Sequence, residues 1–334
     1  MQQTRLDNID LQIIRLLARD SRTHYSNIAS AVGITPSAAK ERINKSVSNG
    51  VIQRFVAHIN PATFGYEKLC ILILKNIDKT LKENDLFKKV SLLGDVLCVS
   101  KHLEGDAIVW LFVKDIAQDK IGILTDLLKP ATLEALIATF RPVTMKIHSS
   151  DLEIMKCLLS DPRILAKDIA KETSLSSKTV ARRLEKMREN HVLEFSILLN
   201  VSSIGLTGYI EFAVLIDVKI SSHQNIVERI NYELQEYLLH LPDWYQREVI
   251  VGVFFCAHIS TVNLILRRLE SYDGVNKVKS YIVTSLTFYQ DLLQIKIDKR
   301  LISQKHLSLS SAAAATTTLQ VAVLLNIISK NNLQ

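Results

Sequence analysis

The residues whose types and spacing most clearly indicate a chemical role are basic residues on two short segments, 141 positions apart. At helical spacing the polar side chains of such a segment share one face. The candidates are Ser37, Lys40, Glu41, Arg42 and Lys45 in the first segment, and Lys178, Thr179, Arg182, Arg183 and Lys186 in the second. Lysine and arginine hold phosphates, and long polar side chains reach base edges. The pattern therefore predicts double-stranded DNA as the partner.

The charge balance supports this interpretation. Three basic residues against Glu41 leave the first segment at +2, and five against Glu185 and Glu189 leave the second at +3. Arg182 is suited to a bidentate contact with guanine, worth about 1–3 kcal/mol of discrimination. Arg42 and Arg183 lie nearer the buried edge and are expected to hold phosphates. A solvated face is the alternative, but both segments carry the bias on the same face.

Each segment is predicted to be the last helix of a helix-turn-helix, followed by a short strand. Thr35 and Ser176 are suitable N-caps, and Asp7 can cap the first helix of the first unit. Asn49-Gly50 provides a C-terminal stop. The residues expected to face inward are Ala39, Ile43 and Val47 in the first helix, and Val180, Leu184 and Met187 in the second.

The two segments belong to an internal duplication. Asp10–Gln53 aligns without a gap with Asp151–Glu194, and identical pairs include Asp10/Asp151, Arg22/Arg163 and Arg42/Arg183. Capping, core and stop positions coincide over the whole alignment. The chain is thus predicted to contain two winged helix-turn-helix units.

After each unit the pattern changes to alternating strands and helices. The first half is predicted to contain strands at Lys68–Asn76, Val96–His102, Ala107–Val113 and within Thr132–Ile147, with helices at Lys79–Leu92 and Asp115–Leu128. The second half is predicted to contain strands at Tyr209–Lys219, Trp244–Val249, Val251–Ala257 and Val275–Thr284, with helices at Gln224–Leu239 and Ser260–Tyr272. Both orders are βαββαβ, which is typical of a ferredoxin-like domain.

The expected fold is therefore α+β, with two copies of a winged helix-turn-helix followed by a ferredoxin-like domain. The predicted boundaries are 1–60, 61–148, 149–200, 201–290 and a tail at 291–334. Within the tail, Ser308–Thr318 has low complexity and Leu319–Lys330 can form one more helix.

Composition restricts the possible functions. The 334 residues are 48% hydrophobic and 22% charged, as in a well-packed soluble protein, and the net charge of +7 favours a polyanionic partner. The four cysteines have no disulfide or metal-ligand spacing, and no apolar run approaches a membrane span. No glycine-rich phosphate loop or catalytic triad pattern is present. We expect a cytoplasmic protein without cofactor, metal or membrane partner.

Several stretches resemble the Lrp/AsnC transcription regulators. They are LDNIDLQIIRLL, GITPSAAKERI, GVIQRFVAHINPATFGY and EGDAIVWLFV. The second half is similar but more divergent, with Ser174 in place of the turn glycine and His191 in place of Gly50. The resemblance implies a sequence-specific DNA-binding regulator from a prokaryote. Family members usually carry one such unit and dimerise, so two units in one chain imply an internal pseudodimer that reads an asymmetric site.

The resemblance also implies small effectors, often amino acids, bound between α/β domains. Gly105 and Asp106 match the family's effector loop in the first unit, whereas the second unit lacks this pair. A plain turn is the alternative interpretation of the two residues. Further assembly into a homo-oligomer stays open.

Two other functions stay open. Sirohaem decarboxylases are similar to the same family, and some are tandem copies of about this length. The candidate residues for such chemistry are Lys101, His102, Tyr245 and Arg247, but neither stretch matches the enzyme pattern of a histidine strand leading into Asn-Met-Trp. We therefore expect no enzyme activity. The second alternative is an architectural protein that binds DNA with little sequence preference.

Overall fold

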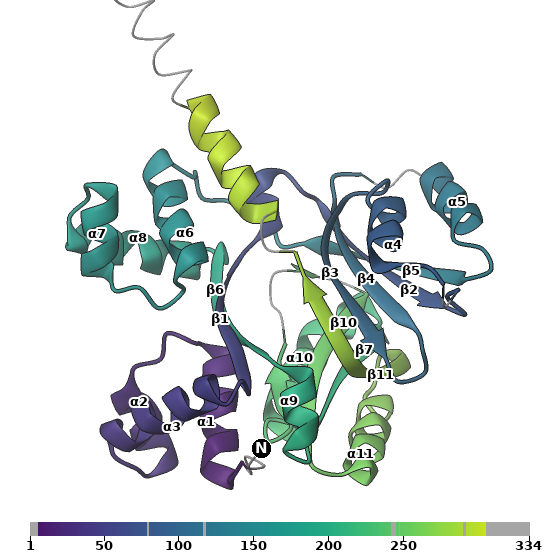
Figure 1. The fold of residues 1–334 in the computed structure, drawn as a ribbon, viewed down its shortest axis with the longest axis horizontal. Helices are drawn as coiled ribbons and strands as arrows, with labels where there is room; N and C mark the ends of the chain where they lie inside the picture. The colour runs from purple at the N-terminus through teal and green to yellow at the C-terminus, as the bar shows by residue number, and fades with distance from the viewer. Residues whose placement is uncertain are drawn as a thin grey trace, which may run out of the picture.

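The computed structural model describes residues 6–78, 80–115, 118–241, 245–246, 248–289 and 292–304. Three helices open each half, and in Figure 1 the two three-helix units lie together on one side of the molecule, with the sheets on the other. The helices are α1 Asn8–Arg19, α2 Tyr25–Val32, α3 Pro36–Ser48, α6 Ser149–Ser160, α7 Ala166–Thr173 and α8 Ser177–Glu189. The tail segments 308–318 and 319–330 lie outside the described residues.

The predicted capping residues begin these helices. The Thr35 hydroxyl accepts the backbone N–H of Ala38 at 3.2 Å, and the Ser176 hydroxyl accepts that of Thr179 at 3.1 Å. Asp7 caps α1 in a reciprocal capping box with Asp10. Each contact satisfies an N–H that has no partner within the helix.

The inward face of α8 is confirmed, but that of α3 is partly wrong. Val180, Leu184 and Met187 are buried in α8. In α3, Ala39 and Ile43 are buried, whereas Val47 is 41% exposed and Ser46 takes the third inward position. A helix turns about 100° per residue, so Ser46 lies about 20° from Ala39 around the axis and Val47 about 80°. The buried stripe follows the helix geometry rather than the apolar residue type.

The strands that follow α3 and α8 pair with each other. β1 Ile52–Ile59 and β6 Leu193–Leu199 form an antiparallel two-stranded ribbon, with Val56 opposite Ser196. The ends of each strand pack on different units: Ala57 and Ile59 of β1 join the core of the second unit, and Ile197 and Leu199 of β6 join that of the first. The ribbon therefore ties the two helix-turn-helix units together.

The rest of each half forms the expected α+β sheet domain. The first contains β2 Lys68–Lys75, α4 Glu83–Val90, β3 Asp95–His102, β4 Ala107–Val113, α5 Gln118–Leu127 and β5 Thr132–Phe140. The second contains β7 Ile210–Val218, α10 His223–Glu233, β8 Leu238–His240, β10 Val249–Cys256, α11 Ile259–Glu270 and β11 Val275–Phe288. The strand orders β3-β4-β2-β5 and β8-β10-β7-β11 are equivalent. The short helices are η1 Pro61–Phe64, α9 Val201–Leu206 and η2 Ile220–Ser222.

The second half departs from the prediction between residues 234 and 249. The predicted helix Gln224–Leu239 ends at Glu233, and β8 takes the place of its last turn. Within the predicted strand Trp244–Val249, Tyr245–Gln246 forms the two-residue β9, which pairs with β5 of the first half, and Val249 opens β10. Short apolar runs fit a helix end and a buried strand equally well, so pairing partners decide between them.

The two sheets join into one. β11 pairs with β3 over Val283–Phe288, which gives the nine-stranded order β8-β10-β7-β11-β3-β4-β2-β5-β9. The inner faces share a core in which Ile71 and Phe112 of the first half meet Leu215 and Val251 of the second. Helices α4 and α5 cover the outer face of the first half, and α10 and α11 that of the second. The two α/β domains are therefore in direct contact within one chain.

Residues 292–304 form a helix that the sequence patterns did not predict. It is drawn in yellow in Figure 1, next to α6. Its Ile297 is fully buried in the core of the second helix-turn-helix unit, and Asp298 pairs with Lys156 of α6 at 2.7 Å. The beginning of the predicted tail therefore belongs to the packed structure.

The left-handed residue that ends α7 gives a first testable prediction. Ser174 has φ of 54°, and its counterpart Gly33 after α2 has φ of 72°. A non-glycine residue in this region is strained by about 1–2 kcal/mol, partly offset because glycine has more freedom when unfolded. Ser174→Gly is therefore expected to raise the free energy of unfolding by about 0.5–1 kcal/mol. Urea denaturation measures this change in the free energy of unfolding. The control Gly33→Ser is expected to lower the free energy of unfolding. Destabilisation by both substitutions would contradict the argument.

Candidate nucleic-acid interface

The long cations of the two candidate helices point outward. Lys40 and Lys45 of α3 are exposed, as are Lys178, Arg182 and Lys186 of α8. Ser37 and Glu41 are also exposed, and Thr179 is half-buried beside the N-cap of α8. Each helix thus presents a continuous polar face with an excess of positive charge, opposite the buried stripe that fixes its orientation.

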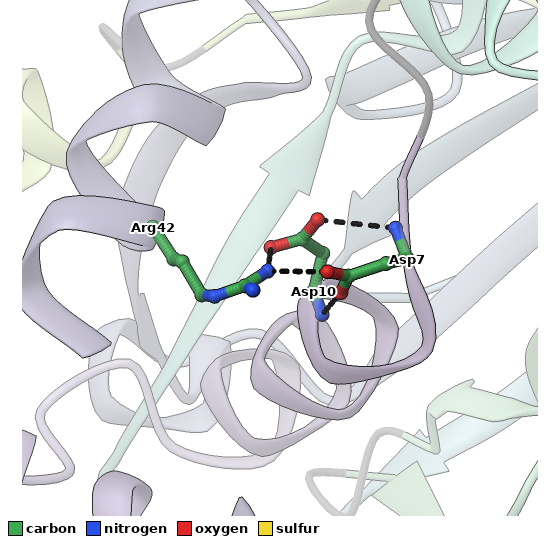
Figure 2. Close-up of polar contacts among 3 residues, drawn as sticks. All are labelled: Asp7, Asp10 and Arg42. Carbon is green, nitrogen blue, oxygen red and sulfur yellow. Dashed lines mark hydrogen bonds and ion pairs between the residues drawn. The ribbon is translucent and has the colours of Figure 1, made fainter. Parts of the chain in front are cut away.

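Arg42 is engaged within the chain. Its Nη1 lies 2.7 Å from Oδ2 of Asp7 and 2.8 Å from Oδ1 of Asp10, so the guanidinium of α3 holds the N-terminus of α1, as Figure 2 shows. Hydrogen bonds to Asp10 and Asp7 raise the pKa of Arg42 above its ordinary value. Burial raises the pKa of Asp7, but the Asp10 backbone N–H and Arg42 outweigh it and the net shift is downward.

The same ion pair occurs in the second copy. Nη1 of Arg183 lies 2.8 Å from Oδ1 of Asp151, whose side chain is 0% exposed, and the other oxygen of Asp151 accepts the backbone N–H of His148 at 2.8 Å. Sequence reasoning missed these pairs. The signal was available, since Asp10/Asp151 and Arg42/Arg183 are both identical between the two copies.

Each helix-turn-helix unit contributes an arginine to the contacts between the two units. Arg22 donates to the carbonyls of Pro162 and Ile164 at 2.7 and 2.9 Å. Arg188 of α8 forms an ion pair with Asp20 at 2.7 Å. These contacts link the C-terminal end of α1 to the second unit.

The ribbon supplies further links. The Ser196 hydroxyl donates to the carbonyl of Ala18 at 2.7 Å, and the Ser21 N–H donates to the carbonyl of Phe195 at 3.2 Å. The guanidinium of Arg22 lies over Phe195, and that of its repeat counterpart Arg163 lies over Phe55. The two units are therefore fixed relative to each other, and so are the candidate helices that they carry.

The candidate effector residues lie in the β3–β4 turn. Gly105 has φ of 85°, which suits glycine, and the His102 N–H donates to the carbonyl of Asp106 at 2.9 Å. The Asp106 carboxylate is buried and lies 3.5 Å from Nζ of Lys75. The Leu103 N–H donates to the carbonyl of Ile282 in β11 at 3.1 Å. The turn thus lies at the seam between the two sheet domains.

Of the four residues considered for enzyme chemistry, the structure describes the side chains of Lys101 and His102, which make separate contacts. Lys101 pairs with Glu83 at 3.1 Å, and the buried His102 lies 2.8 Å from the Ser100 hydroxyl. Burial lowers the pKa of His102 to about 4. The side chain of Tyr245 and the whole of Arg247 lie outside the described residues.

The described residues contain no group of three His, Cys, Asp or Glu side chains placed to hold a metal ion. Cys70, Cys98, Cys157 and Cys256 are buried free thiols, and burial raises the pKa of Cys70 to about 12. No helix among the described residues is both long and apolar enough to cross a membrane.

Comparison with known proteins finds helix-turn-helix regulators. Residues 6–45 match the AsnC-type helix-turn-helix domain, and residues 147–194 match a winged helix-turn-helix DNA-binding family. An uncharacterised helix-turn-helix transcriptional regulator of Pyrococcus horikoshii is 33% identical over 128 residues, which are 37% of this chain and 78% of that protein. The transcriptional regulator FL11 of Pyrococcus furiosus is 25% identical over 149 residues, 45% of this chain and 95% of that protein.

Two solved structures are also similar. The siroheme decarboxylase NirDL, in complex with an iron-uroporphyrin III analogue, aligns with 89% of this chain and 99% of its own at 14% identity and a TM-score of 0.45. LrpC of Bacillus subtilis aligns with 43% of this chain and 99% of its own at 18% identity and a TM-score of 0.31.

Proposed function

Since the chain belongs to the AsnC-type family of helix-turn-helix transcriptional regulators, we propose that its two helix-turn-helix units bind one DNA duplex together as an internal pseudodimer. The observation that carries this proposal is the pair of outward, basic faces on α3 and α8, held in a fixed relation by the β1/β6 ribbon. Two such helices read successive major grooves when they are about 34–36 Å apart. The protein acts in the cytoplasm, where its operator lies.

The operator is asymmetric because the two faces differ. The first presents Ser37, Lys40, Glu41 and Lys45, and the second presents Lys178, Thr179, Arg182 and Lys186. Arg182 reads guanine through a bidentate contact, and the exposed lysines hold phosphates. Each half-site therefore has its own sequence, in contrast to the palindrome that a symmetric homodimer selects.

Arg42 and Arg183 stay proposed DNA contacts, and their ion pairs within the chain support a second role. Both guanidinium groups are engaged with carboxylates at the start of the first helix of their unit. We propose that they also set the orientation of α3 and α8, from which the exposed cations contact DNA. Gly105 and Asp106 stay proposed effector contacts, supported by the position of their turn beside Ile282 of the other sheet domain.

Selection of binding sites from random duplex DNA at about 0.15 M salt tests the proposal. The wild-type chain is expected to select an asymmetric site. The variant Lys178→Ala/Arg182→Ala is expected to lose preference in one half-site and to bind about 10–100-fold more weakly, since two contacts with DNA are removed. The control Arg267→Ala/Lys277→Ala removes the same charge from exposed positions on the second sheet domain and leaves the selected sequence unchanged.

Three outcomes would contradict parts of the proposal. A perfect palindrome selected by a complex with one chain would refute the asymmetric operator. Equal affinity for selected and random DNA would show that the protein is an architectural DNA-binding protein and not a sequence-specific regulator. Equal losses in the variant and its control would mean that net charge, rather than the α8 face, controls binding.

A further inference from the structure

A cavity of about 170 Å³ lies between the β1/β6 ribbon and the inner face of the nine-stranded sheet. Most of its wall is apolar. The ribbon contributes Ile197 and Leu199, and the sheet contributes Trp110, Val253 and Phe288. An apolar cavity of about 150 Å³ holds a molecule the size of benzene. This cavity is therefore large enough for one ring or a short branched chain.

Glu211 places a carboxyl group in this apolar wall. It is the only acidic residue among the described residues that line the cavity. Glu211 and Ala213 lie two positions apart in β7, so both side chains point to the same face of the sheet, which is the cavity side. Oε2 of Glu211 is buried and has no hydrogen-bond partner among the described residues. A carboxylate in this position loses its hydration without a compensating partner, which is unfavourable unless a cation joins it.

Among the described residues, the other titratable side chains that line the cavity supply no such cation at neutral pH. His58 and His240 stack with ring centroids 5.8 Å apart, and burial lowers the pKa of His58 to about 4 and that of His240 to about 3. Arg54 lies over the Phe288 ring at 5.5 Å and lowers the pKa of His58. The pKa of Glu211 is raised to about 7 by burial alone, without a contribution from Arg54. Burial also keeps the Cys98 thiol protonated by raising its pKa.

We propose that this cavity binds a small primary amine in its protonated form, with the Glu211 carboxylate as counter-charge and the apolar wall around the hydrocarbon part. The ammonium group supplies hydrogen-bond donors to the buried oxygen and the charge that the site lacks. One ring or a branched chain of about six to nine heavy atoms fits the volume. A molecule with a carboxylate head meets Glu211 with like charge and is excluded.

The ligand would also link the DNA-binding and sheet parts of the chain. The cavity wall combines His58 and Leu199 of the ribbon with Glu211 and Val251 of the sheet. The ribbon in turn packs on both helix-turn-helix units. An amine in the cavity therefore favours one position of the ribbon against the sheet, and with it one placement of the linked α3 and α8 relative to the sheet domains. This regulatory step rests on the proposed DNA-binding function, whereas the binding of the amine does not.

Isothermal titration calorimetry of the full chain tests the site with three molecules that share a benzene ring and differ in the charge of the head group. Benzylamine carries an ammonium head, benzyl alcohol a neutral head and benzoate a negative head. At pH 8 benzylamine is expected to bind at least about tenfold more tightly than benzyl alcohol, and benzoate not at all. The preference for the amine grows from pH 6 to pH 8 as Glu211 ionises, whereas the affinity for the alcohol stays constant.

Variants locate the binding. Glu211→Gln is expected to abolish the preference for benzylamine over the alcohol, while the control Glu248→Gln, at an exposed position before β10, keeps it. Ala213→Leu fills the cavity from the same strand and is expected to abolish the binding of both molecules. Equal affinity for amine and alcohol, or amine binding that survives Ala213→Leu, would overturn the proposal.

A second measurement separates the site from the DNA-binding function. Affinity for the selected operator is measured with and without saturating benzylamine, and a change of about threefold or more is expected for the wild type but not for Glu211→Gln. Intact amine binding with unchanged operator affinity would refute the coupling alone. Amine binding in a chain that binds no DNA would refute the proposed function and leave the ligand site standing.

Discussion

Replacing Arg183 by methionine is expected to lower the free energy of unfolding of the second helix-turn-helix unit by about 3 kcal/mol. The reason is the carboxylate left behind. Asp151 is 0% exposed, and Arg183 provides the charge that compensates it at 2.8 Å. Removing one partner of a buried ion pair leaves an uncompensated charge, which is more harmful than removing both. The backbone N–H of His148 keeps one hydrogen bond to Asp151 and limits the loss.

The duplication provides a matched control, because Arg42→Met breaks the equivalent pair in the first unit. There the partners Asp7 and Asp10 are 52% and 16% exposed, so water replaces the guanidinium when it is lost. The expected loss is about 1 kcal/mol. The two substitutions are identical in chemistry and repeat position and differ in the burial of the carboxylates and in Asp7, the second acidic partner of Arg42.

Native-state hydrogen exchange measures the two losses separately, because it reports the opening of α6–α8 and of α1–α3 without assuming that the whole chain unfolds in one step. The double variant Arg183→Met/Asp151→Asn removes the buried charge together with its partner and is expected to recover most of the lost stability. Equal losses for Arg42→Met and Arg183→Met, or no recovery in the double variant, would contradict this account.

The elements that sequence predicted well are those fixed by local residues. Thr35, Ser176 and Asp7 act as caps because their side chains reach N–H groups three residues away. The βαββαβ order followed from apolar runs separated by turns, and the duplication made each half a check on the other. The ion pairs of Arg42 and Arg183 were within reach, because a repeat that retains both an acid and a base at fixed positions indicates a contact between them.

The features that sequence missed depend on contacts between distant segments. The pairing of β1 with β6 and of β11 with β3 joins residues more than 100 positions apart, and no local pattern specifies which exposed strand edge meets which. The helix at 292–304 is held by Ile297 in the core of the second helix-turn-helix unit. Val47 is apolar, but it lies about 80° from Ala39 around the helix axis, so residue type alone assigns it wrongly to the buried face. The cavity next to Glu211 arises only once the ribbon and both sheets are assembled.

The cavity histidines predict that the free energy of unfolding falls in acid. Burial lowers the pKa of His58 to about 4 and that of His240 to about 3, against 6.5 when unfolded. Between these values the unfolded chain binds protons that the folded chain does not, so stability present above pH 6.5 is lost as the pH falls. The loss is about 1.4 kcal/mol per pH unit for each histidine, which gives about 3 kcal/mol for His58 by pH 4.

Glu211 has the opposite effect on the pH dependence of the free energy of unfolding. Burial raises its pKa to about 7, against 4.5 when unfolded. Here the folded chain binds the extra proton, so the contribution of Glu211 is present below pH 4.5 and is lost as the pH rises toward 7. Glu211→Gln is therefore expected to match the wild type in stability near pH 4.5 and to exceed it by about 3 kcal/mol at pH 8.

Urea denaturation between pH 4 and pH 8.5 tests the direction of both pH effects. It compares the wild type with the variants His58→Gln/His240→Gln and Glu211→Gln. The variant His58→Gln/His240→Gln is expected to lose much of the acid sensitivity, and the remainder comes from groups such as His102, whose pKa is also about 4. Unchanged acid sensitivity in this variant would contradict the assignment to the cavity pair. A Glu211→Gln variant no more stable than the wild type at pH 8 would mean that the carboxylate is already compensated.

The same variant connects stability to the proposed ligand. Saturating benzylamine at pH 8 is expected to narrow the gap in stability between Glu211→Gln and the wild type by at least about 1.4 kcal/mol, because an ammonium ion beside Oε2 stabilises the ionised carboxylate of the wild type and has no charged partner in the variant. A group that destabilises the empty protein and strengthens binding of the ligand contributes to recognition rather than to folding. If the amine raised the stability of both proteins equally, its effect would come from filling the cavity, and Glu211 would have no part in recognition.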